Sequence, residues 1–312
     1  MNKPRISVIM SVKDSEDTVG RTIDSILEQT FNDIEFIIID DFSSDSTFDI
    51  LKEYEKKDNR VKIIKNKKWL GKCISRNIAI KRSKGEYIAI TDGDDISLPN
   101  RLEKELIYLD KNPNCYLVGS RAMILDEIGR KIGISWGSKK EGDISNELVN
   151  QNRLVHSTVM FRNTKEFLYR EKFRHAQDYD LFLQILYKKK EIHMINDILV
   201  MYRSKRDIQY NDYLIQQLYF AQVSREIYKG ELRYEDFDEN ELEKYIPKKM
   251  IVEVNMKKNF YNGKFKESRE YIKKLLKMSN NFIWGLYLAD SYLGGLIFKI
   301  GKIFKRLFIS RI

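Results

Sequence analysis

The chain has 312 residues, of which 42% are hydrophobic and 33% are charged. This balance argues against a disordered chain or a polytopic membrane protein, and the length suits one large domain or a domain with an appendage. Two cysteines, Cys73 and Cys115, are too few for a disulfide framework and predict a reducing, cytosolic compartment. The net charge of +10 would suit a nucleic acid or an anionic membrane, although a lysine-rich solvated surface explains it more simply.

Four apolar runs of strand length lie in the first third of the chain, at residues 5–12, 35–40, 61–66 and 86–92. The first run is too short for the apolar segment of a signal peptide, so we expect no such peptide. Continuous runs rich in Ile and Val, bounded by polar turns, are typical of parallel strands buried on both faces.

Amphipathic helical patterns alternate with these runs, with apolar faces within residues 19–27, 50–54, 74–79 and 102–109. We expect Ser15 and Ser43 or Ser44 to cap the first two helices. Alternating strands and helices at this spacing predict an α/β fold, with a doubly wound, mostly parallel sheet covered by helices on both faces.

Acidic residues follow three of the predicted strands: Asp14 after the first, Asp40 and Asp41 at the end of the second, and Asp92, Asp94 and Asp95 after the fourth. Ligands of open α/β sheets bind beyond the carboxyl ends of the strands, where these residues would converge. Helix caps and Asx-turns explain one such cluster easily but three poorly. With only three histidines, the chain suits an all-oxygen Mg²⁺ or Mn²⁺ site better than a zinc site.

Five segments resemble, in order, the family 2 glycosyltransferases, which have the GT-A fold of nucleotide-diphospho-sugar transferases. They are residues 7–47, 69–102 with the turn "TDGDD", 156–162 as "HSTVMFR", 176–186 as "AQDYDLFLQIL", and 201–205 as "MYRSK". Each segment alone is a weak signal, but five in the same order make a strong one.

The resemblance implies a role for each matched residue. It places Ser11, Val12 and Asp14 in the nucleotide pocket, Asp41 against the pyrimidine N–H, and Arg76 near the donor phosphates or sugar. Beyond these donor-binding residues, it implies that the "TDGDD" turn binds the ribose, the diphosphate and the metal.

Within that turn, the resemblance makes Asp92 and Asp94 donor-binding and Asp94 and Asp95 ligands of Mn²⁺ or Mg²⁺. It makes Asp178 the general base that deprotonates the acceptor hydroxyl, which gives inversion at the sugar carbon. The alternative for Asp178 is a helix N-cap or an acidic residue in the first turn of a helix. His156 is expected to line the acceptor side or to fill a polar niche.

The sequence departs from the family pattern at several positions. Lys13 stands where Tyr is common, Asp14 where Asn is common, Phe42 where Gly is common, and Gln177 replaces a frequent Glu before the catalytic Asp. The Gln-x-x-Arg-Trp signature of processive synthases is absent from the sequence. We therefore expect the transfer of one sugar per encounter.

The sequence changes character near residue 213, which divides it into a GT-A catalytic domain (1–212) and a helical region (213–312). Residues 248–278 predict two amphipathic helices joined at Asn262 and Gly263, an αα-hairpin. Residues 291–312 contain no acidic side chain, and their cations lie mostly opposite an apolar helical face. Such a tail suits an anionic membrane surface, although packing within the protein is the simpler alternative.

We therefore predict a cytoplasmic enzyme, peripheral on the inner face of the plasma membrane, that uses a nucleotide-diphosphate sugar (UDP-sugar) and a glycan or lipid-linked acceptor. An inactive nucleotide-sugar-binding module at the membrane is one alternative. A nucleotidyltransferase of the same fold is another, but the acidic "SVKDSEDTVGR" stands where its basic phosphate loop would be. We expect no nucleic-acid partner, since no recognition motif accompanies the charge.

Overall fold

The computed structural model describes residues 3–126, 128–135, 137, 141–204, 212–278 and 282–292. These residues divide into two compact units, one within Met1–Lys205 and Tyr228–Glu231, the other within Arg206–Ile227 and Leu232–Ile312. The domain division expected after residue 212 remains a prediction, since compactness alone does not show that either unit folds independently.

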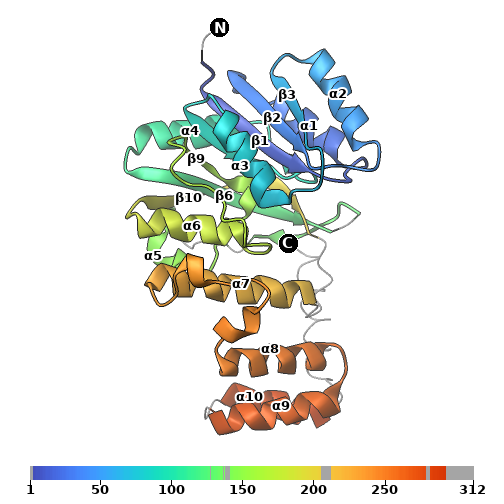
Figure 1. Ribbon diagram of the computed structural model, residues 1–312, viewed down its shortest axis with the longest axis vertical. Helices are drawn as coiled ribbons and strands as arrows, with labels where there is room; N and C mark the ends of the chain where they lie inside the picture. The colour runs from blue at the N-terminus through green and yellow to red at the C-terminus, as the bar shows by residue number, and fades with distance from the viewer. Residues whose placement is uncertain are drawn as a thin grey trace. The chain divides into compact units, whose positions relative to one another are not determined.

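The structure confirms the predicted alternation of strands and helices in the first unit (Figure 1). The elements are β1 (Ile6–Val12), α1 (Val19–Leu27), β2 (Ile34–Asp40), α2 (Thr47–Lys57), β3 (Val61–Lys65), α3 (Lys72–Arg82), β4 (Tyr87–Ile90) and, after β5 (Ile96–Ser97), α4 (Arg101–Lys111). Every residue of β1, β2 and β4 is buried, as expected for parallel strands covered on both faces.

Further strands and helices complete the first unit. They are β6 (Cys115–Leu125), β7 (Lys131–Ile134), β8 (Gly142–Asp143), α5 (Ser145–Leu148), the 3₁₀ helix η1 (His156–Thr158), β9 (Met160–Arg162), α6 (Gln177–Tyr187) and β10 (Glu191–Arg203). The described strands form one sheet in the order β3-β2-β1-β4-β9-β6-β10-β5, with β7 beside β6 and β8 beside β10. Strands β1 to β4 are parallel, whereas β9 runs antiparallel between β4 and β6.

One hydrophobic core cluster lies on one face of this sheet. Alternate residues of β1, namely Ile6, Val8, Met10 and Val12, pack there with buried side chains of α1, α2 and α4. Helix α3 packs on β1 and β2 outside that core cluster. The period of two along each strand therefore sends one set of side chains toward each helical layer.

The helix caps differ from the prediction. Helix α1 begins after Thr18 and α2 after Ser46, rather than after Ser15 and Ser43 or Ser44. The hydroxyls of Ser43 and Ser44 instead hydrogen-bond to Asp14, on the neighbouring loop. Tertiary contacts at the sheet edge have replaced the local capping role.

The second unit is helical. It contains most of α7 (Asp212–Lys229), the 3₁₀ helices η2 (Tyr234–Asp236) and η3 (Leu242–Tyr245), then α8 (Lys248–Tyr261), α9 (Phe265–Met278) and α10 (Phe282–Tyr292). Gly263, with φ 77°, turns the chain between α8 and α9, which confirms the predicted αα-hairpin. None of the helices in the described residues is long and apolar enough to cross a membrane. The basic tail beyond residue 292 lies outside the described residues.

Candidate active site

The carboxyl ends of β1, β2 and β4 meet at one edge of the sheet. The parallel register pairs Val12 with Asp40, and Ile9 with Ile90. The turn after β4 lies against β1 so closely that a Cβ on Gly93 would stand 2.5 Å from Val12 Cγ1. This contact requires glycine in the "TDGDD" turn and gives Val12 a packing role.

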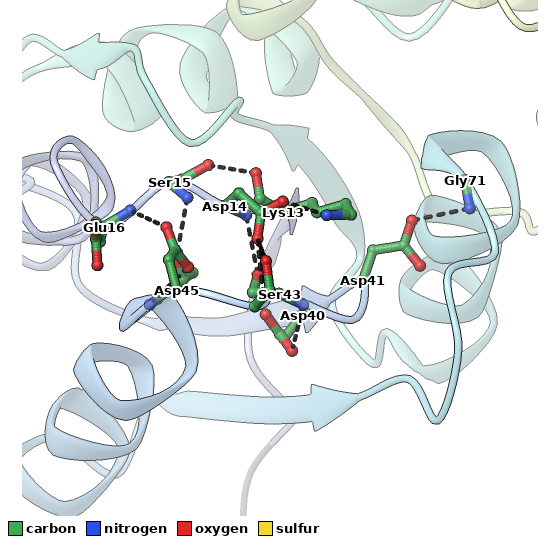
Figure 2. Close-up of polar contacts among 11 residues, drawn as sticks. Lys13, Asp14, Ser15, Glu16, Asp40, Asp41, Ser43, Asp45 and Gly71 are labelled. Carbon is green, nitrogen blue, oxygen red and sulfur yellow. Dashed lines mark hydrogen bonds and ion pairs between the residues drawn. The ribbon is translucent and has the colours of Figure 1, made fainter.

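Asp14 joins the loops that follow β1 and β2 (Figure 2). Its Oδ1 accepts hydrogen bonds from Ser44 N at 2.8 Å and from Ser44 Oγ at 3.1 Å, while its own N–H donates to Ser43 Oγ at 3.1 Å. Lys13 Nζ contacts the other carboxylate oxygen. The hydrogen bonds from Lys13 and Ser44 lower the pKa of Asp14 to about 2, so it is an anion at neutral pH.

Asp41 fixes a second loop at the same edge. Its Oδ1 accepts from Asn66 Nδ2 at 2.8 Å and from Leu70 N at 2.9 Å. Its Oδ2 accepts from Gly71 N at 2.8 Å (Figure 2). Since each carboxylate oxygen has two lone pairs, Oδ2 keeps one further acceptor position beside these contacts. Asp41 therefore holds the loop before α3 in place.

Asp92 lies between Arg76 and His156. Arg76, which is buried, donates from Nη2 to Asp92 Oδ1 at 2.5 Å, and His156 Nδ1 lies 3.6 Å from Asp92 Oδ2. Burial alone would raise the pKa of Asp92, but the charge of Arg76 and the contact with His156 hold it well below its usual value. Asp92 is therefore ionised and compensated from within the protein.

Tyr169 contacts His156 at the ring nitrogen that does not face Asp92. Tyr169 OH lies 2.7 Å from His156 Nε2, and Asn77 holds the Tyr169 main chain through two 2.8 Å hydrogen bonds. Burial and the charge of Arg76 lower the pKa of His156, which favours the neutral ring. A neutral ring with its proton on Nδ1 satisfies both partners, because Nε2 then accepts from Tyr169. His156 thus belongs to the Asp92 cluster rather than simply filling a polar niche.

Asp95 faces the protein interior. Ser157 Oγ donates to its Oδ2, and Arg203 N donates to its Oδ1 at 2.9 Å. Burial and the charges of Asp92 and Asp94 raise the pKa of Asp95 well above its usual value. The metal role expected for Asp95 remains a prediction, but in this geometry both of its oxygens connect η1 and β10 to the turn.

Three carboxylates fit within four positions because their surroundings differ. Asp92 is paired with Arg76, Asp95 is buried with a raised pKa, and Asp94 is half-buried. Among the described residues, no group of three or more His, Cys, Asp or Glu side chains is placed to hold a metal. A metal bound at this turn would have to take most of its ligands from substrate phosphate oxygens and water.

Arg101 supports the turn from inside the protein. It is fully buried and donates to Glu105 Oε1 at 3.0 Å, to Ser97 Oγ at 3.0 Å and to the Ile90 carbonyl at 2.8 Å. Although Arg101 opposes the effect, burial raises the pKa of Glu105 to about 7. The arginine ties both ends of the 91–96 segment to α4.

Asp178 lies in the first turn of α6, which begins after Ala176 in a left-handed conformation with φ 52°. Asn152 Nδ2 donates to Asp178 Oδ2 at 3.0 Å, and Asn152 is held in turn by the Leu154 N–H at 3.1 Å. The charge of Asp178 acts to raise the pKa of both His156 and Tyr169, so Asp178 is near enough to the Asp92 cluster to influence it.

The family model of glycosyl transferase family 2 matches residues 7–204, which contain every one of these side chains. The chain belongs to glycosyl transferase family 2.

Curated relatives of this family 2 glycosyltransferase include an uncharacterized glycosyltransferase of Methanocaldococcus jannaschii, MJ1057. The two are 35% identical over 208 residues, which cover 65% of this chain and 72% of the relative. Another relative is WfgD of Escherichia coli, named a UDP-Glc:alpha-D-GlcNAc-diphosphoundecaprenol beta-1,3-glucosyltransferase. It is 31% identical over 194 residues, covering 61% of this chain and 73% of the relative.

Solved structures support the GT-A fold. The S. aureus TarS 1-349 structure in complex with UDP matches with a TM-score of 0.59 at 18% identity, over 86% of this chain and 78% of TarS 1-349. The mannosyltransferase PcManGT of Pyrobaculum calidifontis, in complex with GDP-Man and Mn²⁺, matches with a TM-score of 0.59 at 14% identity, over 99% of this chain and 84% of its own.

Several side chains of this family 2 site were not identified from sequence. Asn66, Tyr169, Asn152 and Arg101 each hold a predicted site residue or turn, yet none belongs to a recognisable local pattern. Arg101 lies within the 69–102 segment that resembles the family, but its burial and its contacts are visible only in the structure. The structure brings the predicted Asp14, Asp41 and Asp92 to one edge of the sheet.

Proposed function

We propose that the protein transfers a sugar from a nucleotide-diphosphate donor to an acceptor hydroxyl, with inversion and one sugar per encounter. The observation that carries this proposal is the turn after β4, which presents Asp92 and Asp94 at the edge where the Asp14 and Asp41 loops meet. Asp178, whose charge acts on the pKa of His156 beside Asp92, is the base that we propose for the acceptor hydroxyl.

The relatives support the choice of donor and acceptor. WfgD is named for a UDP-Glc donor and a diphosphoundecaprenol-linked acceptor, and TarS is in complex with UDP. We propose a UDP-sugar donor and a lipid-linked glycan acceptor in bacterial surface glycan synthesis. The protein would then work at the inner face of the plasma membrane, and the tail at 291–312 would contribute to its attachment.

The residues of the turn fit a divalent metal that binds few protein ligands. Mg²⁺ and Mn²⁺ sites commonly use one or two carboxylates and complete their shell with phosphate oxygens and water. We propose that Asp94 holds the metal and that Asp92 contributes negative charge next to it. Asp95 would position the turn through its buried hydrogen bonds to Ser157 and the Arg203 N–H. When bound, the metal would neutralise charge on the departing diphosphate.

The chain's own residues bind and orient the donor. Asp41 can accept a nucleobase N–H at the free position on Oδ2, next to its bonds to the 66–71 loop. Ser11, Val12 and Asp14 would form the floor of the nucleotide pocket at the end of β1. Arg76 would act through Asp92, because its guanidinium is buried against that carboxylate rather than exposed to phosphates.

Asp178 would take the proton of the acceptor hydroxyl as that oxygen attacks the anomeric carbon. The hydrogen bond from Asn152 fixes one carboxylate oxygen, leaving the other to receive the proton. Attack opposite the leaving diphosphate gives an inverted product. A general base of this kind contributes roughly two to four orders of magnitude to turnover.

Thermal unfolding with UDP, GDP, dTDP and CDP, each with and without Mn²⁺, tests the donor site. A nucleotide at about 100 times its dissociation constant should stabilise the protein by roughly 2.7 kcal/mol, a shift of a few degrees. We expect the largest shift with UDP and Mn²⁺ together. Absence of a shift with all four nucleotides would contradict the proposal, and a shift without product formation would favour the inactive binding module.

The contact between Tyr169 and His156 gives a second prediction. Tyr169→Phe removes the hydroxyl that donates to His156 Nε2, so the imidazole proton is no longer held on Nδ1, which faces Asp92 Oδ2. Asp92 keeps its bond to Arg76 but loses the fixed orientation of its second partner. A neutral hydrogen bond contributes about 1 kcal/mol, so the Mn²⁺ concentration for half-maximal activity should rise roughly fivefold. Tyr116→Phe is the matched control, since its buried hydroxyl bonds Thr164 instead. An equal rise in both variants would show a general loss of stability.

A further inference from the structure

The positive charge of the protein is concentrated at its C-terminal end. Residues 244–312 contain 16 basic and four acidic side chains, a net charge of +12, whereas residues 1–243 carry a net charge of −2. Within the larger region, residues 244–278 contain 11 basic and three acidic side chains. The net positive charge of the whole chain therefore comes from the α8–α9 hairpin and the residues after it.

The fold gathers part of this charge at one end of the hairpin. Helices α8 and α9 lie side by side and antiparallel, and Ser268 Oγ donates to the Met256 carbonyl at 3.2 Å across them (Figure 1). This register places the start of α8 beside the end of α9. The exposed lysines at that end are Lys248, Lys249, Lys274 and Lys277, which we call the lysine end.

The lysine end is not neutralised within the described part of the chain. Lys257 of α8 and Lys273, which directly precedes Lys274, pair with Glu253 and Glu270. None of the four lysines of the lysine end forms an ion pair with a described residue. Lys274 Nζ lies 5.3 Å from the ring centroid of Tyr271, which leaves its charge available. Four uncompensated cations so close together attract an anionic surface.

The apolar side of the hairpin is already occupied. Met256, Phe260, Ile272 and Leu275 are buried, and they pack with Trp284 and Tyr287 of α10. The hairpin therefore lacks the free apolar face with which an amphipathic helix inserts among acyl chains. Its attraction to a partner must come mainly from charge.

Lysine chemistry favours a membrane over a nucleic acid as the partner. The single arginine of the hairpin, Arg269, donates to the Ser291 carbonyl at 3.1 Å and stacks over Tyr292, so no arginine fork is presented at the lysine end. Lysine is a compact point charge that suits the diffuse potential of anionic phospholipids, whereas phosphate and base recognition in nucleic acids relies strongly on arginine.

We propose that the lysine end of the α8–α9 hairpin docks electrostatically on an anionic phospholipid surface. This extends the proposed membrane attachment from the tail to the α8–α9 hairpin and does not depend on the donor chemistry. The attraction falls with ionic strength, as expected for cations within a Debye length of a charged surface.

Sedimentation of the full chain with vesicles tests this proposal. Wild type should bind vesicles containing phosphatidylglycerol at low salt and dissociate from them at high salt. It should not bind vesicles of pure phosphatidylcholine. The variant K248Q/K249Q/K274Q/K277Q should bind the anionic vesicles about tenfold more weakly or worse. The matched control K81Q/K84Q/K111Q/K188Q removes the same charge from exposed lysines of the first unit and should bind as wild type.

Equal binding by the hairpin variant and wild type, or an equal loss in the control, would overturn the proposal. Displacement of wild type from the vesicles by a short oligonucleotide, at matched charge concentration, would favour a nucleic-acid partner instead. UDP-dependent thermal shifts should be unchanged in both variants, because none of the eight lysines lies in the donor site. Failure of the donor proposal would remove those shifts without altering sedimentation, so the two failures are distinguishable.

Discussion

Asp178→Asn should lower kcat by roughly two to four orders of magnitude while nucleotide binding stays intact. The amide cannot accept the proton of the acceptor hydroxyl, although it has the shape of the carboxylate and can still accept the hydrogen bond from Asn152. The measurement is turnover of a UDP-sugar with a soluble acceptor, together with UDP affinity for the same variant.

This substitution also separates the two explanations of Asp178. In the first turn of a helix, asparagine loses only the interaction of the carboxylate charge with the helix dipole, worth about 0.3–1 kcal/mol, so a residue that only starts α6 should tolerate it with little change in turnover. Asp197→Asn serves as a matched control, since Asp197 is an exposed carboxylate that pairs with Lys104 away from the site. Turnover at the wild-type level in Asp178→Asn would exclude this residue as the general base.

Asp94→Asn should lower kcat/KM by roughly two to three orders of magnitude, because charge neutralisation on the leaving diphosphate is worth several kcal/mol. The loss of kcat/KM should become smaller as the Mn²⁺ concentration rises, because a site with lower metal affinity can still be saturated. Initial rates across a Mn²⁺ titration, with UDP affinity measured in parallel with and without the metal, provide the test.

Asp95→Asn is the informative comparison for the turn. Asp95 is buried and bonded to Ser157 and the Arg203 N–H, so its replacement should change the unfolding temperature more than the metal dependence. The opposite result, with metal dependence altered at Asp95 and unaltered at Asp94, would reassign the ligand to Asp95.

Much of the first unit was predictable because its signals are local. The apolar runs at 5–12 and 35–40 became β1 and β2 with nearly the expected bounds, since a strand buried on both faces must be apolar throughout. The convergence of Asp14, Asp41 and Asp92 also followed, because parallel strands send their carboxyl ends to one edge. The predicted N-cap positions were wrong, because the hydroxyls of Ser43 and Ser44 hydrogen-bond to Asp14 on another loop.

The partners of the site residues could not be predicted. Arg76 and Asp92 are 16 residues apart, Asn152 and Asp178 are 26 apart, and Arg203 and Asp95 are 108 apart. No periodicity links such positions, because each contact depends on how a loop returns to the sheet. The antiparallel β9, inserted between β4 and β6, is what brings η1 and its histidine to the turn.

The sequence by itself determined the α/β alternation, the family, and the edge of the sheet where chemistry would be found, because these follow from the local order of apolar and acidic residues. Only the tertiary structure decided what each carboxylate of the "TDGDD" turn can do. Asp92 is compensated by a buried arginine, Asp95 is enclosed, and Asp94 is half-buried. Charge state depends on burial and on neighbouring charges, and both are properties of the folded chain.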